Sequence, residues 1–384
     1  PVSLSHQPQY IRLMRFLHRR GFSSTLLQPA LFSGMPGELV VSLPESCLLT
    51  TSTVLNSYLG EYIKSWKPRL SPLLALCVFL VCERQRGEAS DWFPYINVLP
   101  NSYACPAYFS DDVVDVLPAG VRRRGLEQRE AVLVLQTSVF ADLYRTLQPV
   151  LSRPTEDVLT YEALRWAWCS VNTRSVFMSR PSSCFLSGPD TYALAPFLDL
   201  LNHRPDVQVK AGFNEQTKCY EIRSVCGTPR YEQAFINYGS HDNQRLLLEY
   251  GFVAMNNPHS VIYVEPSKSH LWRPALLGQA VDEKTEVRSS QTARTLCQQL
   301  LKDTQIALDK VHINTDQSIS WKKIGLKCFI FLFLDLPASG SVWGASQRAA
   351  GGCEGIAPGG EVDLRELCYS SKRLCDSRKR DVLM

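Results

Sequence analysis

Hydrophobic residues near the start of the chain recur every three or four positions, as they do on one face of a helix. Tyr10, Ile11, Met14 and Leu17 follow this spacing, and Gly21 comes after them as a natural stop. Because a surface helix buries one face and exposes the other, the pattern predicts a short amphipathic helix that ends near Gly21.

A strand pattern and then a long helical pattern follow. Residues 39–43 are mostly apolar and partly β-branched, and Pro44 closes them, which predicts a strand. From Thr53 to about Ala193, apolar residues recur at helical spacing between prolines. Since proline interrupts helices, we expect this part to form several helices rather than one.

The pattern changes again after Tyr192. Apolar and polar residues alternate over 207–213 and again over 220–222, and the polar segment 214–217 separates the two runs. Alternation places successive side chains on opposite faces of a sheet, so this stretch predicts a β-hairpin. A further short strand is expected at 234–238.

The remaining segments predict a strand, a helix and a tail. Residues 260–265 have strand character, and residues 284–312 have apolar positions at helical spacing. Beyond Leu336 the composition shifts to Gly, Ala and Ser, which predicts a disordered, low-complexity tail over 336–384.

Composition excludes several classes of protein. The chain has 384 residues, 45% of them hydrophobic, so it can bury a sizeable core and is neither fibrous nor wholly disordered. Its 41 Lys and Arg nearly balance its 37 Asp and Glu, which gives no dominant electrostatic reason to bind nucleic acid or an anionic membrane. No uncharged apolar run in the chain is long enough to span a membrane.

The cysteines favour a reducing compartment. There are 13 of them, spread through apolar runs, and no Cys-x-x-Cys pair occurs. Disulfide frameworks and zinc sites need closely spaced cysteines, so we expect neither a disulfide scaffold nor a structural metal site. Two basic clusters in the tail, 372–373 and 378–380, indicate either a nuclear-import signal or a solvated tail. We therefore expect the protein in the nucleus and the cytoplasm, with the role of the tail left open.

Two short segments carry polar residues that packing does not require. The apolar run 195–201 leads directly into Asn202-His203, and the predicted strand at 234–238 ends in Tyr238-Gly239. Taken singly, Asn202-His203 is typical of a turn with satisfied hydrogen bonds, and Tyr238 is typical of a buried ring.

Together and in this order, these motifs resemble the SET-domain protein methyltransferases, and most closely the subgroup like the Rubisco large-subunit methyltransferase. The resemblance covers roughly residues 39–264. It implies an α+β fold of small β-sheets around a pseudoknot, in which 235–239 lies beside Asn202-His203. The subgroup also has a helical insert, here at about 68–165, and a helical substrate-binding domain.

The expected domains follow from this resemblance. They are an N-terminal helical segment at 1–32, a SET domain at 33–264, a partial helical C-terminal domain at 265–335 and the tail at 336–384. The C-terminal domain looks shortened after about Lys323, where an apolar run and low complexity replace it.

The resemblance also implies roles for particular residues. Asn202 and His203 match positions that bind S-adenosylmethionine, and Tyr238 matches the residue at the point of methyl transfer. Arg174 matches an arginine that contacts the carboxylate of the cofactor, and Tyr250 matches an aromatic wall of the lysine channel. From the residues alone, Arg174 as a surface arginine and Tyr250 as a core aromatic stay open.

The implied activity is protein-lysine N-methylation of histones or other nuclear and cytosolic proteins. Only a neutral amine can attack a methyl group, and deprotonating a lysine at pH 7 costs about 4.6 kcal/mol in water. A desolvated site beside positive charge lowers that cost. A histidine-methylating relative carries a polar residue two positions after the matched arginine, where this chain has Val176, so lysine is favoured.

One departure from the family pattern favours a different class of function. SET domains begin with a strand and a Gly-x-Gly turn that wraps the cofactor, whereas here 32–37 runs directly into the strand at 39–43. A chain without that turn would be a catalytically impaired SET-fold interaction module, which keeps the fold but does not hold the cofactor. Both the enzyme and the interaction module stay open.

Overall fold

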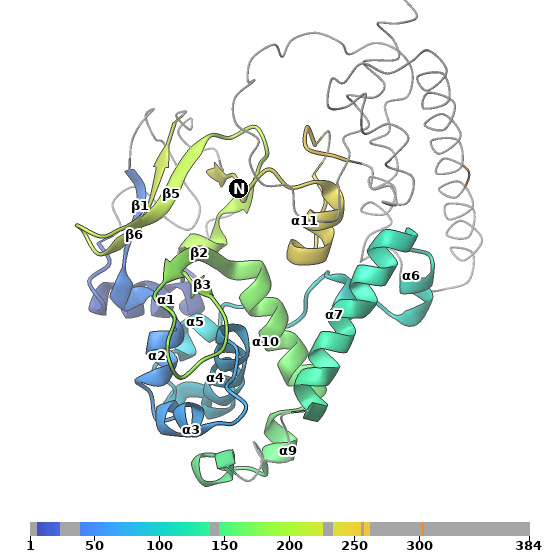
Figure 1. Cartoon of the computed structure of the whole chain (residues 1–384). Helices are drawn as coiled ribbons and strands as arrows, with labels where there is room; N and C mark the ends of the chain where they lie inside the picture. The colour runs from blue at the N-terminus through green and yellow to red at the C-terminus, as the bar shows by residue number, and fades with distance from the viewer. Residues whose placement is uncertain are drawn as a thin grey trace, which may run out of the picture. The chain divides into compact units, whose positions relative to one another are not determined.

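The computed structural model describes residues 6–23, 39–138, 146–225, 233–254, 257–261 and residue 302 (Figure 1). The α-helices are α1 (Pro8–Arg19), α2 (Thr51–Leu55), α3 (Gly60–Ser65), α4 (Pro72–Arg86), α5 (Phe93–Ile96), α6 (Asp111–Asp115), α7 (Ala119–Ser138), α9 (Thr155–Val158), α10 (Tyr161–Arg174) and α11 (Asn243–Tyr250). The strands are β1 (Leu39–Pro44), β2 (Ser175–Arg180), β3 (Asp190–Leu194), β4 (Asn202–His203), β5 (Val209–Asn214), β6 (Cys219–Ser224) and β7 (Phe235–Ile236). Helices and small sheets together make the α+β fold that the sequence predicts.

The strands form three small sheets. One has the order β1-β6-β5 and is antiparallel, the second pairs β2 with β3 antiparallel, and the third pairs β4 with β7 in parallel. In β1 the alternating residues Val41 and Leu43 are buried and pair with Ile222 and Tyr220 of β6. The predicted strand at 39–43 and the predicted hairpin at 207–222 are therefore confirmed.

The helical prediction is correct as far as Arg174 and wrong beyond it. Helices occupy most of the chain from Thr51 to Arg174, but residues 175–194 contain the strands β2 and β3. Residues of β2 and β3 pair across the hairpin, for example Val176 with Ala193. This pairing joins residues 17 positions apart, so a search for helical spacing within one segment does not detect it.

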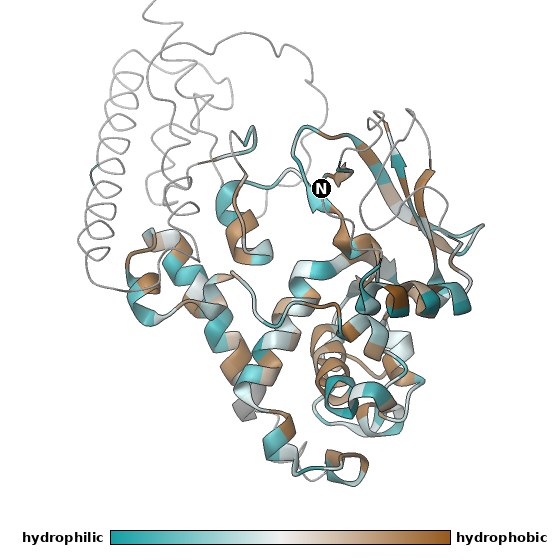
Figure 2. Ribbon diagram, turned by 180° about the vertical axis from the view of Figure 1, so that it is seen from behind, coloured by the Kyte–Doolittle hydropathy of each residue, from teal (hydrophilic) through white to brown (hydrophobic). Residues whose placement is uncertain are grey.

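The core of the helical part is α4, which packs against α10. Residues 74–82 of α4 are all buried, so the helix is apolar around its whole circumference and is mostly brown in Figure 2. Such helices are buried on every side. The hydroxyls of Ser71 and Thr160 accept hydrogen bonds from the first turns of α4 and α10, which fixes where both helices begin.

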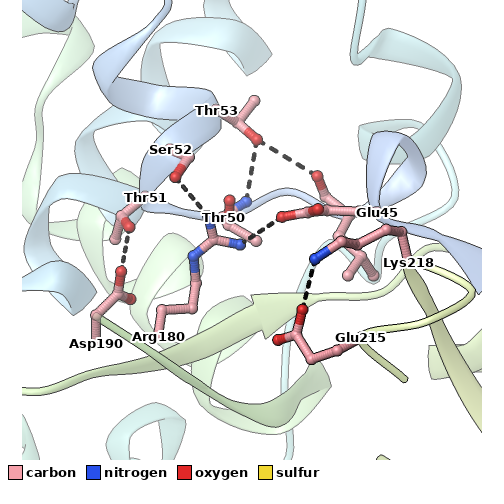
Figure 3. Close-up of polar contacts among 10 residues, drawn as sticks. Glu45, Thr50, Thr51, Ser52, Thr53, Arg180, Asp190, Glu215 and Lys218 are labelled. Carbon is pink, nitrogen blue, oxygen red and sulfur yellow. Dashed lines mark hydrogen bonds and ion pairs between the residues drawn. The ribbon is translucent and has the colours of Figure 1, made fainter. Parts of the chain in front are cut away.

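Polar contacts fasten the β2–β3 hairpin to the segment that follows β1 (Figure 3). Arg180 of β2 donates to Glu45 Oε1 at 3.0 Å and to Ser52 Oγ at 2.6 Å. At the start of β3, the buried carboxylate of Asp190 accepts from the hydroxyl of Thr51. These contacts hold the strand that follows Arg174 against the beginning of α2.

The chain divides into two compact units. The first comprises Pro1–Phe109, Arg124–Ser240 and Arg245–Phe252, and the second comprises Ser110–Arg123, His241–Gln244 and Val253–Met384. All five predicted site residues lie in the first unit. In the second, the side-chain amide of Asn257 donates to the His241 carbonyl at 2.9 Å and to Asn243 Oδ1 at 3.1 Å. The predicted domain boundaries and the limits of the insert at about 68–165 stay predictions.

Several predictions concern segments outside the described residues. These are the stretch before β1 that lacks a Gly-x-Gly turn, most of the strand at 260–265, the helix at 284–312 apart from residue 302, and the tail at 336–384. Within the described part of the chain, no helix is both long enough and apolar enough to cross a membrane.

Candidate active site

The two motifs singled out in the sequence lie side by side. Asn202 pairs with Phe235 and His203 with Ile236 in the parallel sheet of β4 and β7, and the Arg204 amide donates to the Ile236 carbonyl at 3.0 Å. The predicted juxtaposition is therefore confirmed, whereas the interpretation of Asn202-His203 as a turn is wrong. Their backbone groups find partners more than 30 residues away, which local sequence does not reveal.

Tyr238 is hydrogen-bonded to residues 201 and 203 through both its backbone and its side chain. Its backbone amide donates to His203 Nδ1 at 3.0 Å, and its hydroxyl donates to the Leu201 carbonyl at 2.5 Å. Because Nδ1 accepts, the ring proton of His203 sits on Nε2. Burial, opposed by the charge of Arg174, raises the pKa of Tyr238 to about 12. The hydroxyl is therefore neutral near pH 7 and is no general base there.

Aromatic rings surround the Tyr238 side chain. Its ring centroid lies 5.0 Å from that of Tyr250, 5.1 Å from that of His203 and 6.2 Å from that of Phe252. All four side chains are half-buried. Faces of aromatic rings attract cations, so this cluster suits an ammonium group. Tyr250 is thus brought to Tyr238 as predicted, and Phe252 joins it.

Arg174 ends α10 and turns inward. Its Nη1 donates to the backbone carbonyl of Asp199 at 3.0 Å and to Asp199 Oδ2 at 3.2 Å. The side chains of Arg174 and Asp199 are 21% and 2% exposed, so Arg174 is not a freely solvated surface arginine. Tyr95 of α5 donates its hydroxyl to the same Oδ2 at 3.0 Å. The three residues form one buried chain of hydrogen bonds.

The opposite charges of Arg174 and Asp199 counteract the effect of burial on the pKa of each group. Burial alone would lower the pKa of Arg174, but the charge and hydrogen bond of Asp199, together with Tyr95 and Tyr103, outweigh it and raise that pKa above its ordinary value. Burial raises the pKa of Asp199, against the opposing effects of the Arg174 charge and the Tyr95 hydrogen bond. Arg174 therefore carries a permanent positive charge within the protein.

A strained turn at Phe197 places Asp199 within hydrogen-bond distance of Arg174. Phe197 has φ 76° and ψ −47°, a conformation that costs of order 1–3 kcal/mol for a residue with a side chain. The buried Phe197 ring packs 5.3 Å from the ring of Phe22, centroid to centroid. This packing holds the turn, after which the short helix Leu198–Leu200 presents Asp199.

Two groups of this site have unused hydrogen-bonding capacity. The side chain of Asn202 is exposed and makes no hydrogen bond to the described residues, and Arg174 Nε is buried without a partner among them. An amide and a guanidinium N–H are suited to polar and carboxylate groups of a ligand. Across the described ranges, no three His, Cys, Asp or Glu side chains are arranged to hold a metal ion.

Comparison with known proteins identifies the family. No family model matches the chain. SET domain-containing protein 4 of Mus musculus is 40% identical over 383 aligned positions, which cover 83% of this chain and 87% of the relative. The chain belongs to the SET domain-containing protein 4 family. The predicted family resemblance is therefore confirmed.

More distant comparisons agree with this SET-domain assignment. The actin-histidine N-methyltransferase of Homo sapiens is 29% identical over 229 positions, covering 59% of this chain and 38% of the relative. A solved structure of Rubisco LSMT bound to sinefungin and monomethyllysine matches with a TM-score of 0.54 at 16% identity, covering 86% of this chain and 88% of that one. This structural match confirms the SET fold.

Sequence reasoning missed three residues of this SET-domain site: Asp199, Tyr95 and Phe252. Asp199 carried a detectable signal, because it is a single carboxylate inside the apolar run 195–201. Phe252 follows Tyr250 closely and was readable as core. Tyr95 lies 104 positions before Asp199, and nothing in its surroundings along the chain indicates that they meet.

Proposed function

We propose that this chain is an S-adenosylmethionine-dependent protein-lysine N-methyltransferase. The observation that carries the proposal is the pairing of β4 with β7, which joins Tyr238 to both His203 and Leu201. A tyrosine hydroxyl held on a carbonyl, among aromatic rings and beside a half-buried arginine, makes a site for orienting an amine. The family and the lysine-bound structural neighbour support this interpretation.

The residues present fit the cofactor. Asn202 has an exposed side-chain amide that makes no hydrogen bond to the described residues. The Nε–H of Arg174 is buried and likewise has no partner among them. Asn202 and the backbone of His203 would bind the nucleoside part, and Arg174 would bind the carboxylate, for which a planar guanidinium is suited. When bound, S-adenosylmethionine supplies an electrophilic methyl group.

The protein's own residues would make the amine reactive without a general base. Tyr238 stays protonated, so its hydroxyl orients the amine and does not remove its proton. The half-buried rings of Tyr238, Tyr250 and Phe252 would remove water from the amine. Loss of water lowers the pKa of a lysine, and the ring faces then hold the methylated cation.

We propose lysine rather than histidine as the target. Val176 follows Arg174 on β2 and pairs with Ala193, so an apolar side chain stands two positions after the arginine. Valine has no group that could hydrogen-bond to an imidazole nitrogen, which an imidazole would need for orientation. Mass spectrometry of the product distinguishes Nε-methyllysine from methylhistidine, and methylhistidine alone would contradict this choice.

Histones or other nuclear and cytosolic proteins are the proposed substrates, and the nucleus and the cytoplasm are the proposed locations. The basic clusters at 372–373 and 378–380 support nuclear entry. Expression of a fluorescent fusion, with and without substitution of these five basic residues by Gln, tests this. A distribution that the substitutions leave unchanged would remove that support.

The test of function is methyl transfer by the full chain. Purified protein is incubated with labelled S-adenosylmethionine and either core histones or a methyl-deficient lysate, and Tyr238→Phe and Tyr220→Phe are measured alongside. Tyr220 is a buried tyrosine of β6, away from the aromatic cluster, and serves as the matched control. The proposal expects labelling by the parent and by Tyr220→Phe but not by Tyr238→Phe. A folded parent that neither binds cofactor nor labels any protein would favour the interaction module.

A further inference from the structure

The chain of hydrogen bonds from Tyr95 through Asp199 to Arg174 extends beyond the residues that would touch the cofactor. We propose that Tyr95 is a positioning residue, which holds Arg174 through Asp199 in the orientation that binds the cofactor carboxylate. This inference rests on the proposed function, because that function assigns Arg174 to the carboxylate. It gives the helical part of the chain, which supplies Tyr95, a role in cofactor binding.

The geometry fixes which edge of the Arg174 guanidinium remains available. Both hydrogen bonds that Arg174 donates to Asp199 leave from Nη1, one to the backbone carbonyl and one to Oδ2. Two bonds from one nitrogen to one residue fix the plane of the group. The Nε–H, which has no partner in the described ranges, lies on another edge of that plane. An N–H of this kind is suited to bind a carboxylate.

Asp199 can hold Arg174 only if Asp199 is itself held. Its side chain is 2% exposed, so water does not stabilise it. Oδ1 has no partner among the described residues, and Oδ2 accepts from Arg174 and from Tyr95. The Tyr95 hydroxyl is therefore one of two donors to this carboxylate, and the one whose position does not depend on Arg174.

Tyr95 is well placed for this role. It is fully buried in α5, and its hydroxyl donates to Asp199 at 3.0 Å. A phenylalanine would fill the same core volume, so packing alone does not require the hydroxyl. The hydroxyl is the part of Tyr95 that connects the helical part of the chain to the turn that carries Asp199.

The charged and titratable groups around Asp199 come from four places in the chain. Arg174 comes from α10, Tyr95 from α5, Tyr103 from the loop after α5 and Tyr238 from the segment after β7. The Tyr95 hydrogen bond favours the ionised carboxylate, so its loss raises the pKa of Asp199 further. In Tyr95→Phe, Asp199 then gains its proton at a higher pH than in the parent, and Arg174 is released at that pH.

Two ligands separate positioning of Arg174 from a general effect on the fold. S-adenosylhomocysteine carries the carboxylate, and 5′-methylthioadenosine has the same nucleoside and sulfur without the amino-acid part. In calorimetric titrations of the full chain, Tyr95→Phe should lower the affinity for S-adenosylhomocysteine by about 5- to 10-fold, as the loss of one hydrogen bond implies. The affinity of this variant for 5′-methylthioadenosine should stay within twofold of that of the parent. Tyr220→Phe, the matched buried control, should change neither.

Arg174→Ala and the double variant complete the test. Arg174→Ala should weaken S-adenosylhomocysteine selectively, and adding Tyr95→Phe to it should cause no further loss, because Tyr95 acts through Arg174. The affinity of Tyr95→Phe for S-adenosylhomocysteine should also fall at a higher pH, on acidification, than that of the parent. Thermal melts check that each variant folds, and Asp199→Asn replaces Tyr95→Phe if that variant does not.

The outcomes distinguish the two proposals. Equal weakening of both ligands by Tyr95→Phe, or weakening of neither, would overturn the positioning role while a selective loss in Arg174→Ala keeps the cofactor assignment. An unchanged affinity of Arg174→Ala for S-adenosylhomocysteine would refute the cofactor assignment of Arg174, and the role of Tyr95 with it.

Discussion

The most informative single change is Tyr238→Phe, because it separates an enzyme from an interaction module. The substitution keeps the ring and its contacts with Tyr250, His203 and Phe252. It removes the oxygen that donates to the Leu201 carbonyl at 2.5 Å. The aromatic cluster should therefore persist while the group that orients the amine is lost.

The two expected magnitudes differ enough to be measured apart. The lost hydrogen bond should lower the free energy of unfolding by about 0.5–1.5 kcal/mol. Loss of a preorganised contact to the transition state should raise the barrier by about 2.7–4 kcal/mol, or lower the rate by roughly 10²–10³. A change of ring packing would alter stability and cofactor affinity together, whereas this change acts mainly on kcat.

The assay compares kcat for labelled methyl transfer by the parent, Tyr238→Phe and Tyr220→Phe at pH 8, with urea unfolding and cofactor titration of each. At pH 8 the Tyr238 hydroxyl is protonated, since burial raises its pKa to about 12. We expect Tyr238→Phe to keep its fold and to lose nearly all activity. A variant that retains more than a third of the parent rate would refute the catalytic assignment of Tyr238.

Three further predictions concern the same site. Asn202→Ala should weaken the binding of S-adenosylhomocysteine by roughly 1–3 kcal/mol. The melting temperature of the free protein should not fall, because the Asn202 side chain is exposed and makes no hydrogen bond to the described residues. An unchanged ligand-induced shift in melting temperature would show that the Asn202 side chain does not bind cofactor. Arg174→Lys keeps the charge beside Asp199 but loses the planar fork, so calorimetry should find at least about tenfold weaker binding, and an equal Kd would remove Arg174 from the site. The raised pKa of Tyr238 means that folding favours the protonated phenol, so the stability it contributes is complete below about pH 10 and is lost as pH rises towards 12. The difference in unfolding free energy between the parent and Tyr238→Phe should therefore shrink between pH 9 and pH 11.5, and a constant difference would contradict the buried placement of the hydroxyl.

Local pattern was enough for the elements whose stability comes from neighbours along the chain. The amphipathic helix α1, the strand β1 and the hairpin of β5 and β6 all agree with periodicity read from a single segment. The order of Asn202-His203 and Tyr238-Gly239 pointed to the family, and the resemblance named further residues, such as Tyr250, that the fold brings together. These features depend on side-chain spacing, which the sequence states directly.

The rest depends on partners that are far away along the chain. β4 and β7 have two residues each and exist as strands only because they pair with one another, and β2 needs β3 in the same way. Asp199, a lone carboxylate in an apolar run, is stable there because Arg174 and Tyr95 arrive from two different helices to bind it. Burying a charge without partners is costly, so only the tertiary structure, by placing those donors within hydrogen-bond distance, decides what this carboxylate does.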